Sequence, residues 1–347
     1  MKAAYYEQFK SPISIEKLPD PIPGPEDVVI KVAATGLCRS DWHGWQGHDG
    51  DIHLPHVPGH EFAGTIEALG TNIRHFKIGD RVTVPFCGGC GHCTTCLKGQ
   101  EQICDNYFQP GFTAWGSFAE YVRISYAYHN LVKLPDSMEF NTAAVLGCRF
   151  ITAFRGVIAQ GKIKEGEWLA VHGCGGVGLS AIMIAVAAGA QVIAIDIDEE
   201  KLTFAKSFGA IATINAREVD NVPAAVRQII KSGVTVSIDA LGSRETCTNS
   251  ILSLAKQGRH IQLGLLAGAE SNPPIPMSAV IANELEIIGS HGMAAHQYHS
   301  IFTLIEEGKL QPELLISKIV TLEEGIIDLM QLNSFKNTGV TVISFEK

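Results

Sequence analysis

A glycine-rich turn between two apolar stretches constrains the fold of this chain most strongly. The run 168–172 has the composition of a buried strand, and residues 179–188 have that of a helix. The six residues after the strand match G-x-G-x-x-G: the first glycine makes the turn, the second lets the backbone approach a pyrophosphate, and the third permits close packing of helix and strand. This context favours a dinucleotide site over a glycine turn without a ligand. The expected contacts are Gly173, Gly175, Gly176, Val177 and Gly178.

Further apolar runs follow this turn at regular intervals. Residues 192–196, 234–239, 260–263 and 285–289 read as strands, with a helix expected near 199–208. Apolar strands that alternate with helices predict an α/β fold with a parallel sheet covered on both faces. We therefore expect a doubly wound parallel sheet over residues 150–290.

The first part of the chain has a different sequence pattern. Short β-branched runs such as 28–32 and 81–84 are separated by turn signals rich in glycine and proline, for example at 23–25. This predicts a β-rich, barrel-like unit over residues 1–149. The end of the chain contains one helical stretch, 296–307, and a strand-like segment, 339–344, so residues 291–347 are expected to return to the first unit.

Charge and hydropathy exclude several classes of partner. The chain has 347 residues and 27 − 36 = −9 net charge without a basic stripe, which argues against nucleic acid. The longest apolar stretch, 177–190, is too short to span a bilayer and reads as a buried helix. The N-terminus lacks the apolar region of a signal peptide, so we expect a cytoplasmic protein without membrane contact.

Five of the nine cysteines crowd into residues 87–104. A reducing compartment disfavours disulfides, and the spacing C-x2-C-x2-C-x7-C supplies enough thiolates to close a tetrahedral shell. We therefore predict a structural zinc site. Cys87 is expected to be spare, because a set that includes it would be cramped. The predicted ligands are Cys90, Cys93, Cys96 and Cys104.

Other candidate metal ligands are dispersed along the chain. Cys38 lies in Gly-Leu-Cys-Arg-Ser-Asp, His60 and Glu61 in Pro-Gly-His-Glu-Phe, and Cys148 in Leu-Gly-Cys-Arg-Phe. Thiolates and an imidazole suit Zn²⁺, and three protein ligands would leave a fourth position open, as in a catalytic site. His56 is an alternative imidazole ligand.

The carboxylate of Asp196 bears on the choice of dinucleotide. It ends the strand that follows the glycine-rich turn, 18 residues beyond Gly178, and no arginine comes directly after it. A carboxylate there can bind ribose hydroxyls and would repel a 2′-phosphate. The sequence therefore favours NAD(H) over NADP(H).

Taken together, these motifs resemble the zinc-dependent medium-chain alcohol dehydrogenases over nearly the full chain. The resemblance rests on the Gly-His60-Glu61 element, the four-cysteine lobe, the glycine-rich turn and Asp196. It implies a GroES-like catalytic domain, residues 1–149 and 291–347, joined to a Rossmann domain, residues 150–290. It also implies two zinc ions per chain and NAD.

The resemblance assigns roles residue by residue. Cys38, His60 and Cys148 match the catalytic zinc ligands, and the assignment of Cys148 depends on the resemblance alone. Glu61 matches a carboxylate that can approach the metal, and Asp41 one that orients the histidine ligand. Ser40 and His43 match a proton relay. The remaining matches are cofactor contacts and substrate-pocket residues: Arg39, Thr152 and Lys201 for the cofactor, and Phe86, Trp115 and Phe150 for the pocket.

Three departures from the family pattern stand out. A loop over residues 42–58 carries four histidines, most simply read as solvated side chains. Arg149 directly follows a ligand cysteine. The segment 290–296 lacks an arginine common in relatives, which affects only the detailed cofactor contacts.

The implied activity is reversible oxidation of a primary or secondary alcohol to an aldehyde or ketone with NAD. Aromatic side chains near the motifs favour apolar or aromatic substrates. The alternatives are a polyol, threonine or formaldehyde dehydrogenase of the same fold, or a non-catalytic NAD(H)-binding relic. Cys148 argues against the polyol enzymes, which resemble a pattern with a carboxylate ligand. The resemblance also implies a homotetramer or homodimer.

Replacing Asp196 tests the cofactor assignment. Asp196→Ser removes the charge expected to repel a 2′-phosphate, so the preference for NAD over NADP should fall. The ratio of kcat/KM for the two cofactors measures the change. A wild-type protein that already prefers NADPH would contradict the assignment.

Overall fold

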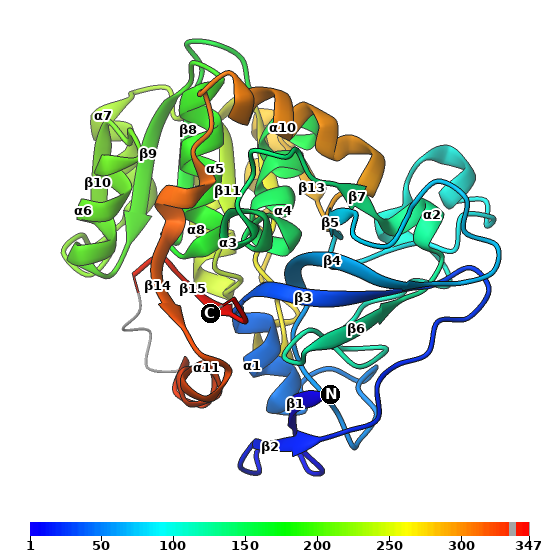
Figure 1. Cartoon of the computed structure of the whole chain (residues 1–347). Coiled ribbons are helices and arrows are strands. Elements are labelled where there is room, and N and C mark those ends of the chain that lie inside the picture. The colour runs from blue at the N-terminus through cyan, green and yellow to red at the C-terminus, as the bar shows by residue number, and fades with distance from the viewer. Residues whose placement is uncertain (333–337, 347) are drawn as a thin grey trace. The chain divides into compact units, whose positions relative to one another are not determined.

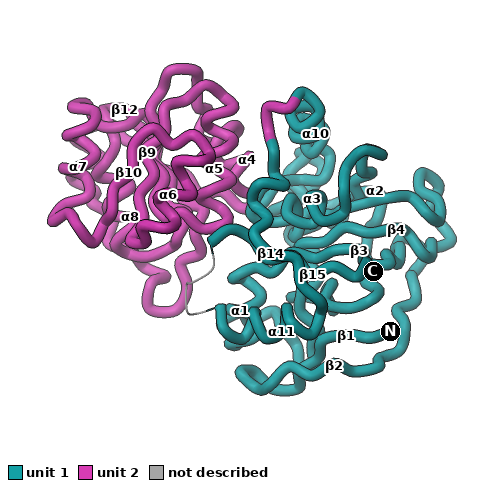
Figure 2. The backbone as a smooth tube through the Cα atoms, turned by 60° about the vertical axis from the view of Figure 1, so that its left-hand side comes forward, with its two compact units in different colours: residues 1–151, 292–307, 311–347 teal, residues 152–291, 308–310 magenta. Residues whose placement is uncertain are grey.

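Two compact units make up the chain in its computed structural model, which describes residues 1–332 and 338–346. One unit comprises residues 1–151, 292–307 and 311–347, and the other residues 152–291 and 308–310 (Figure 2). The first unit is mainly β-structure, and the second is an α/β layer structure.

A seven-stranded sheet forms the body of the first unit. Its order is β14-β15-β3-β4-β5-β7, and β6 also pairs with β3. Strands β1 and β2 form a separate antiparallel pair. The strands of this unit are β1 (Lys2–Tyr5), β2 (Ser14–Lys17), β3 (Val28–Gly36), β4 (Glu61–Leu69), β5 (Arg81–Thr83), β6 (Tyr121–Ile124), β7 (Val132–Lys133), β14 (Ile316–Val320) and β15 (Val340–Ser344).

Strand β3 is the centre of this sheet. It pairs antiparallel with β4, β6 and β15, and most of its side chains are buried. Val28, Ile30 and Val32 pack with Phe62 and Ile66 of β4 in one apolar cluster. Because β15 lies beside β3, the C-terminal part of the chain completes the sheet that the N-terminal part begins (Figure 1).

Short helices position the chemistry-bearing residues of this unit. Helix α1 follows β3 directly, and the π-helical segment η3 continues from α3. Single π-helical turns inside helices occur frequently at functional sites. The helices are α1 (Arg39–Trp45), η1 (Cys96–Lys98), η2 (Glu101–Ile103), α2 (Ala127–Asn130), α3 (Phe140–Ala144), η3 (Leu146–Phe150), η6 (Ala295–Gln297), α10 (Tyr298–Glu306), η7 (Pro312–Leu315) and α11 (Leu322–Met330).

The second unit contains a six-stranded, wholly parallel sheet. Its order, β10-β9-β8-β11-β12-β13, is the doubly wound order 3-2-1-4-5-6 when numbered from β8. The order reverses between β8 and β11, and ligands of such sheets bind at that point. The strands are β8 (Trp168–His172), β9 (Gln191–Asp196), β10 (Ala212–Asn215), β11 (Val234–Asp239), β12 (Leu254–Gln262) and β13 (Glu286–Gly289).

Helices pack against the strands of this parallel sheet from β10 to β12. Helix α5 contacts β8 and β9, α6 contacts β9 and β10, and α8 contacts β11 and β12 (Figure 1). The inner strands are almost continuously buried, as expected for a sheet covered on both faces. The helices are α4 (Ile151–Phe154, which begins in the first unit), η4 (Arg155–Gln160), α5 (Gly176–Ala187), α6 (Glu199–Ser207), α7 (Val222–Ile229), α8 (Arg244–Leu252), η5 (Gly268–Glu270) and α9 (Met277–Asn283).

The expected elements are found, with two informative differences. Helix α5 begins at Gly176 rather than at 179, because the last two glycines of the turn form its first residues. Strand β12 begins at Leu254, six residues before the expected run at 260, in a stretch that includes Lys256, Gln257 and Arg259. Within the described residues, no helix is both long and apolar enough to cross a membrane.

Two glycines of the turn are expected to respond differently to alanine. A Cβ at Gly178 would lie 1.8 Å from the carbonyl oxygen of Gly173, so Gly178→Ala should lower stability by about 1–3 kcal/mol. A Cβ at Gly175 meets no protein atom within 4 Å, so Gly175→Ala should keep the wild-type melting temperature but weaken NADH binding. Thermal unfolding and NADH fluorescence measure the two effects. Equal melting temperatures for both variants would refute the close-packing role of Gly178.

Candidate metal centres and cofactor loop

Asp41 links the two segments that carry the first candidate ligands. Cys38 immediately precedes α1, and Asp41 lies in the first turn of that helix. The Cys38 backbone N–H donates to Asp41 Oδ2 at 3.1 Å, while Oδ1 accepts from the Gly59 N–H at 3.1 Å and from His60 Nδ1 at 2.7 Å. Asp41 is 1% exposed and His60 is fully buried. A carboxylate in this position fixes both the orientation and the tautomer of the imidazole.

The other ring nitrogen of His60 has the features of a metal ligand. In the neutral ring, the proton that Nδ1 donates to Asp41 leaves the lone pair on Nε2. This atom is buried and has no hydrogen-bond partner among the residues that the structure describes. The rings of Phe86 and Phe112 lie edge-on to the imidazole, at centroid distances of 6.2 and 5.3 Å. An unpaired buried acceptor is costly, and a metal ion would satisfy it.

Cys148 joins this group from the π-helical segment η3. The ligand atoms of Cys38, His60, Glu61 and Cys148 all lie within 4.8 Å of one another. Cys38 and Cys148 are half-buried as whole residues. The Cys148 thiol lowers the pKa of Cys38 well below its usual range by hydrogen bonding to it, and nearby Arg149 acts in the same direction. The donor set of two sulfurs and one imidazole fits Zn²⁺.

Glu61 is held by Arg149 rather than left free beside these ligands. Arg149 donates to Glu61 Oε1 from its backbone N–H at 3.1 Å and from Nε at 3.0 Å. Nη2 lies 2.7 Å from Oε2 as an ionic contact, and it also donates to the Leu37 carbonyl at 2.7 Å. Burial raises the pKa of Glu61 to about 7, and the Arg149 charge acts in the opposite direction. The two side chains form a buried ion pair next to the ligand group.

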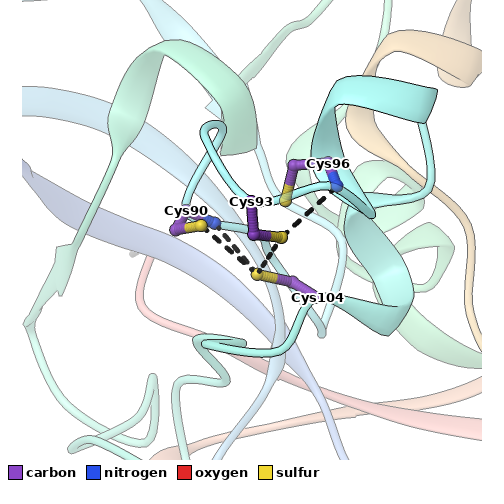
Figure 3. Close-up of side chains that lie close together, drawn as sticks. All are labelled: Cys90, Cys93, Cys96 and Cys104. Carbon is purple, nitrogen blue, oxygen red and sulfur yellow. Dashed lines mark hydrogen bonds between the residues drawn. The ribbon is translucent and has the colours of Figure 1, made fainter.

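The four-cysteine lobe brings its sulfur atoms together (Figure 3). The Sγ atoms of Cys90 and Cys93 lie 3.5 and 3.7 Å from that of Cys104. Tetrahedral zinc–thiolate geometry requires sulfur–sulfur separations of about 3.8 Å. Backbone N–H groups of Cys90, Cys96 and Asn106 donate to sulfurs of the lobe, which stabilises thiolates. Cys87 is not in the group, and none of the nine cysteines, all of which lie among the described residues, forms a disulfide.

Helix α1 also carries Ser40 and His43. The Cys38 thiol lies 3.8 Å from the Ser40 hydroxyl, so Ser40 is next to the ligand group. His43 lies one turn further along. Its Nε2 accepts from Arg39 Nε at 3.4 Å, and its Nδ1 is 2.9 Å from Nδ1 of His48. Burial, together with the charge of Arg39, lowers the pKa of His43 to about 4, so its ring is neutral near pH 7.

The glycine-rich turn in the second unit has an anion-binding form. Gly173 has φ +96°, and the N-terminus of α5 begins directly after Gly175. Helix N-termini present free N–H groups to phosphates. Asp196, at the end of β9, accepts from the Cys174 N–H at 2.7 Å, which fixes its carboxylate beside the turn. A dinucleotide fits this turn, because the space beside Gly175 is open.

The remaining predicted residues lie in varied surroundings. Thr152 is buried in α4, and Lys201 is buried in α6. Phe86 contacts the His60 ring, and Phe150 is fully buried in η3. Trp115 is 38% exposed and donates from Nε1 to the Pro55 carbonyl. Their proposed roles in cofactor and substrate binding stay predictions.

Comparison with known families shows to which class of protein the chain belongs. Residues 24–136 match the alcohol dehydrogenase GroES-like domain, and residues 176–307 match the zinc-binding dehydrogenase family. The chain belongs to the zinc-dependent medium-chain dehydrogenases. It is therefore an oxidoreductase, and its two groups of candidate metal ligands are compatible with the zinc sites of such a dehydrogenase.

Relatives of this dehydrogenase span its whole length. An NAD-dependent alcohol dehydrogenase from Sulfurisphaera tokodaii is 34% identical over 99% of both chains. An acryloyl-coenzyme A reductase from the same organism is 31% identical over 93% of both. The crystal structure of benzyl alcohol dehydrogenase from Acinetobacter calcoaceticus superposes with a TM-score of 0.91 at 27% identity, over 99% of both chains. The likeness therefore covers both units of the dehydrogenase.

Two residues at the site were not found by sequence reasoning. Phe112 packs on the His60 ring at a centroid distance of 5.3 Å, yet no motif surrounds it. Tyr298 of α10 is fully buried, and its pKa is raised well above its usual value by burial and by nearby Cys87 and Cys148. Both come from segments remote in sequence, so only the folded chain identifies them.

The carboxylate of Asp41 provides a test of the first metal centre. Asp41→Asn keeps the size of the side chain but weakens its hold on the His60 imidazole, so zinc affinity at this centre should fall by about 10–100-fold. Chelator competition that resolves the two zinc ions measures the change. The ion in the four-cysteine lobe is the internal control. Unchanged affinity at both centres would exclude an orienting role for Asp41.

Proposed function

We propose that this dehydrogenase catalyses the NAD-dependent, reversible oxidation of an alcohol to an aldehyde or ketone. The observation that carries the proposal is the buried Nε2 of His60, without a hydrogen-bond partner among the described residues, beside the thiols of Cys38 and Cys148. Three such donors leave a fourth zinc position for an exchangeable ligand. The four-cysteine lobe offers no such position, which suits a structural ion.

The two groups that the family binds supply the reactive chemistry. Zinc held by Cys38, His60 and Cys148 would act as a Lewis acid, and NAD would accept the hydride. The protein positions them and tunes their surroundings. The buried pair of Arg149 and Glu61 places a fixed carboxylate beside the zinc ligands, while Asp41 sets the direction of His60 Nε2.

Proton removal is assigned to α1. The Ser40 hydroxyl is near the Cys38 thiol, where it can hydrogen-bond to an alcohol, and His43 lies on the same helix toward its C-terminal end. His43 is neutral near pH 7 because its pKa is lowered to about 4, so it can accept a proton only transiently and pass it on. Glu61 is assigned the role of a carboxylate beside the zinc ligands that can approach the metal.

Cofactor binding is assigned to the second unit. Gly173, Gly175 and Gly178 form the phosphate turn, and the Asp196 carboxylate selects NAD. Arg39, Thr152 and Lys201 are proposed as further contacts. In this scheme residues 1–149 and 291–347 form the catalytic domain, and residues 150–290 form the NAD domain.

Apolar or aromatic alcohols are the proposed substrates. The support is the pair of rings, Phe86 and Phe112, that pack on the zinc ligand His60, together with the likeness to a benzyl alcohol dehydrogenase. Trp115 and Phe150 are assigned to the same pocket. Polyol, threonine and formaldehyde dehydrogenases are the alternatives within the fold. The acryloyl-coenzyme A reductase relative adds reduction of an activated double bond as a further candidate.

Two expectations about the protein in the cell stay predictions. One is a cytoplasmic location. The other is assembly into a homotetramer or homodimer. A non-catalytic NAD-binding relic is disfavoured, because a relic need not keep three convergent zinc ligands. Zinc content distinguishes the two, with about two ions per chain for the enzyme and about one for a relic.

A coupled assay tests the proposed reaction. The zinc-loaded protein is offered aliphatic and aromatic alcohols, polyols, threonine, formaldehyde and acryloyl-coenzyme A, each with NAD(H) and NADP(H). The highest kcat/KM is expected for an apolar alcohol or carbonyl compound with NAD(H). Activity on the thioester alone would replace alcohol oxidation with double-bond reduction. High activity on sorbitol with little on benzyl alcohol would remove the apolar-pocket assignment.

Ser40 is the residue whose replacement should affect chemistry most selectively. Ser40→Ala removes the hydroxyl that receives the alcohol proton, and kcat should fall by about 10²–10⁴-fold. NADH affinity, measured by fluorescence, should stay at the wild-type value. Ser40→Thr retains a hydroxyl and serves as the matched control. A wild-type turnover number for Ser40→Ala would exclude Ser40 from proton transfer.

A further inference from the structure

Helix α1 ends in a hydrogen-bonded turn that brings two histidines together. The His48 N–H donates to the His43 carbonyl at 3.0 Å, and the Gly47 N–H donates to the Gly44 carbonyl at 2.9 Å. Gly47 has φ +75°, which completes a Schellman motif. Such motifs bring the side chains at their two ends into contact, commonly as an apolar pair. Here the contact is between the imidazoles of His43 and His48.

The hydrogen bonds of this pair determine where the protons lie. Arg39 can only donate, so His43 Nε2 is the acceptor of its hydrogen bond and the ring proton of neutral His43 is on Nδ1. That Nδ1 is 2.9 Å from Nδ1 of His48, which must then accept. The proton of neutral His48 is consequently on Nε2. His48 is exposed, whereas His43 is half-buried.

We propose that His48 is the outlet of the proton relay: it takes the proton from His43 Nδ1 and exchanges it with solvent. The proposal rests on the proposed function, because it extends the path that begins at Ser40. His48 acts through His43 and touches neither substrate nor metal.

The surroundings of the pair support a conducting role. The indole of Trp42, 8% exposed, lies edge-on to both imidazoles, with centroid distances of 5.0 Å to His43 and 5.9 Å to His48. The indole therefore packs against both rings of the hydrogen-bonded pair. The other charged or titratable groups that act on His43 are Arg39 and Cys38. Since the pKa of His43 is about 4, the ring does not store the proton that it receives.

The transfer balances without another reactant. One proton arrives at His43 Nε2, after the long 3.4 Å hydrogen bond from Arg39 breaks. The Nδ1 proton of His43 moves to His48 Nδ1, and His48 releases its Nε2 proton to water. Both rings end neutral in their other tautomer and return by exchange with solvent. In aldehyde reduction the same steps run inward.

The other histidines of the loop do not share this position. His56 is buried, and its Nε2 lies 2.9 Å from the Gly111 carbonyl. His53 is exposed and lies ten residues beyond His43 in the chain, so it is a suitable control. An apolar residue could make the same end-of-helix contact, so a leucine in place of His48 separates a structural role from the proton outlet.

Nitrogen chemical shifts of the histidines test the tautomers in the free protein. In ¹⁵N-histidine-labelled wild type, His43 should be neutral with its proton on Nδ1, and His48 should have its proton on Nε2. His43→Gln and His48→Leu assign the signals. An Nε2–H tautomer for His43 would overturn the proposal. This readout requires neither substrate nor turnover, so it can fail independently of the proposed function.

Proton release measures the outlet directly. In a single turnover of the zinc-loaded protein with NAD and alcohol, NADH absorbance follows hydride transfer and a pH indicator follows proton release in weak buffer. His48→Leu keeps the apolar contact of the helix end but cannot accept a proton. It should slow proton release by about tenfold or more, and added imidazole should restore the rate. His53→Leu should behave as wild type.

Each outcome supports or overturns the role of His48 as the proton outlet, or overturns the proposed function. Slow release that imidazole restores, with a wild-type melting temperature, supports the outlet. Release at the wild-type rate in weak buffer, or slow release that imidazole does not restore, overturns it. If the wild type oxidises no alcohol, the proposed function fails instead, and the chemical shifts still report on the histidine pair.

Discussion

The site depends on one buried carboxylate. Asp41 accepts hydrogen bonds from Cys38, Gly59 and His60, and so it holds the start of α1 against the start of β4. A buried carboxylate is tolerated only when its oxygens are fully used, and here they are used to fix two metal-ligand segments. The direction of His60 Nε2, and with it the possibility of a zinc centre, follows from this arrangement.

A second buried charge pair reinforces the same region. Arg149 binds both Glu61 and the Leu37 carbonyl, so it connects the end of β3, the start of β4 and the segment that carries Cys148. Removing one partner of such a pair is strongly destabilising, because the other charge remains buried alone. The unusual arginine beside the ligand cysteine therefore has a structural reason. It also keeps the Glu61 carboxylate in a fixed place next to the ligands.

Much of the fold could be predicted from local pattern, and the failures have physical causes. Apolar runs identified β8, β9 and β11, since strands buried on both faces must be apolar throughout. Helix α5 begins earlier than the sequence pattern predicts, because glycine is a poor helix former and its role at a phosphate-binding helix start outweighs propensity. The sequence pattern does not predict the early part of β12, because exposed Lys256 and Gln257 interrupt its apolar residues.

The sequence by itself determined the motifs that need only a short stretch of consecutive residues. These are the four-cysteine spacing, the glycine-rich turn and the Pro-Gly-His60-Glu segment. Tertiary structure alone decided what those residues meet. Only folding brings Cys148 to His60, places Phe112 on the imidazole and pairs Arg149 with Glu61. The contact of His43 with His48 lies between these local and long-range cases. It needs only one turn of consecutive residues, but it depends on the left-handed conformation of Gly47. Long-range contacts follow from packing, which no short pattern encodes.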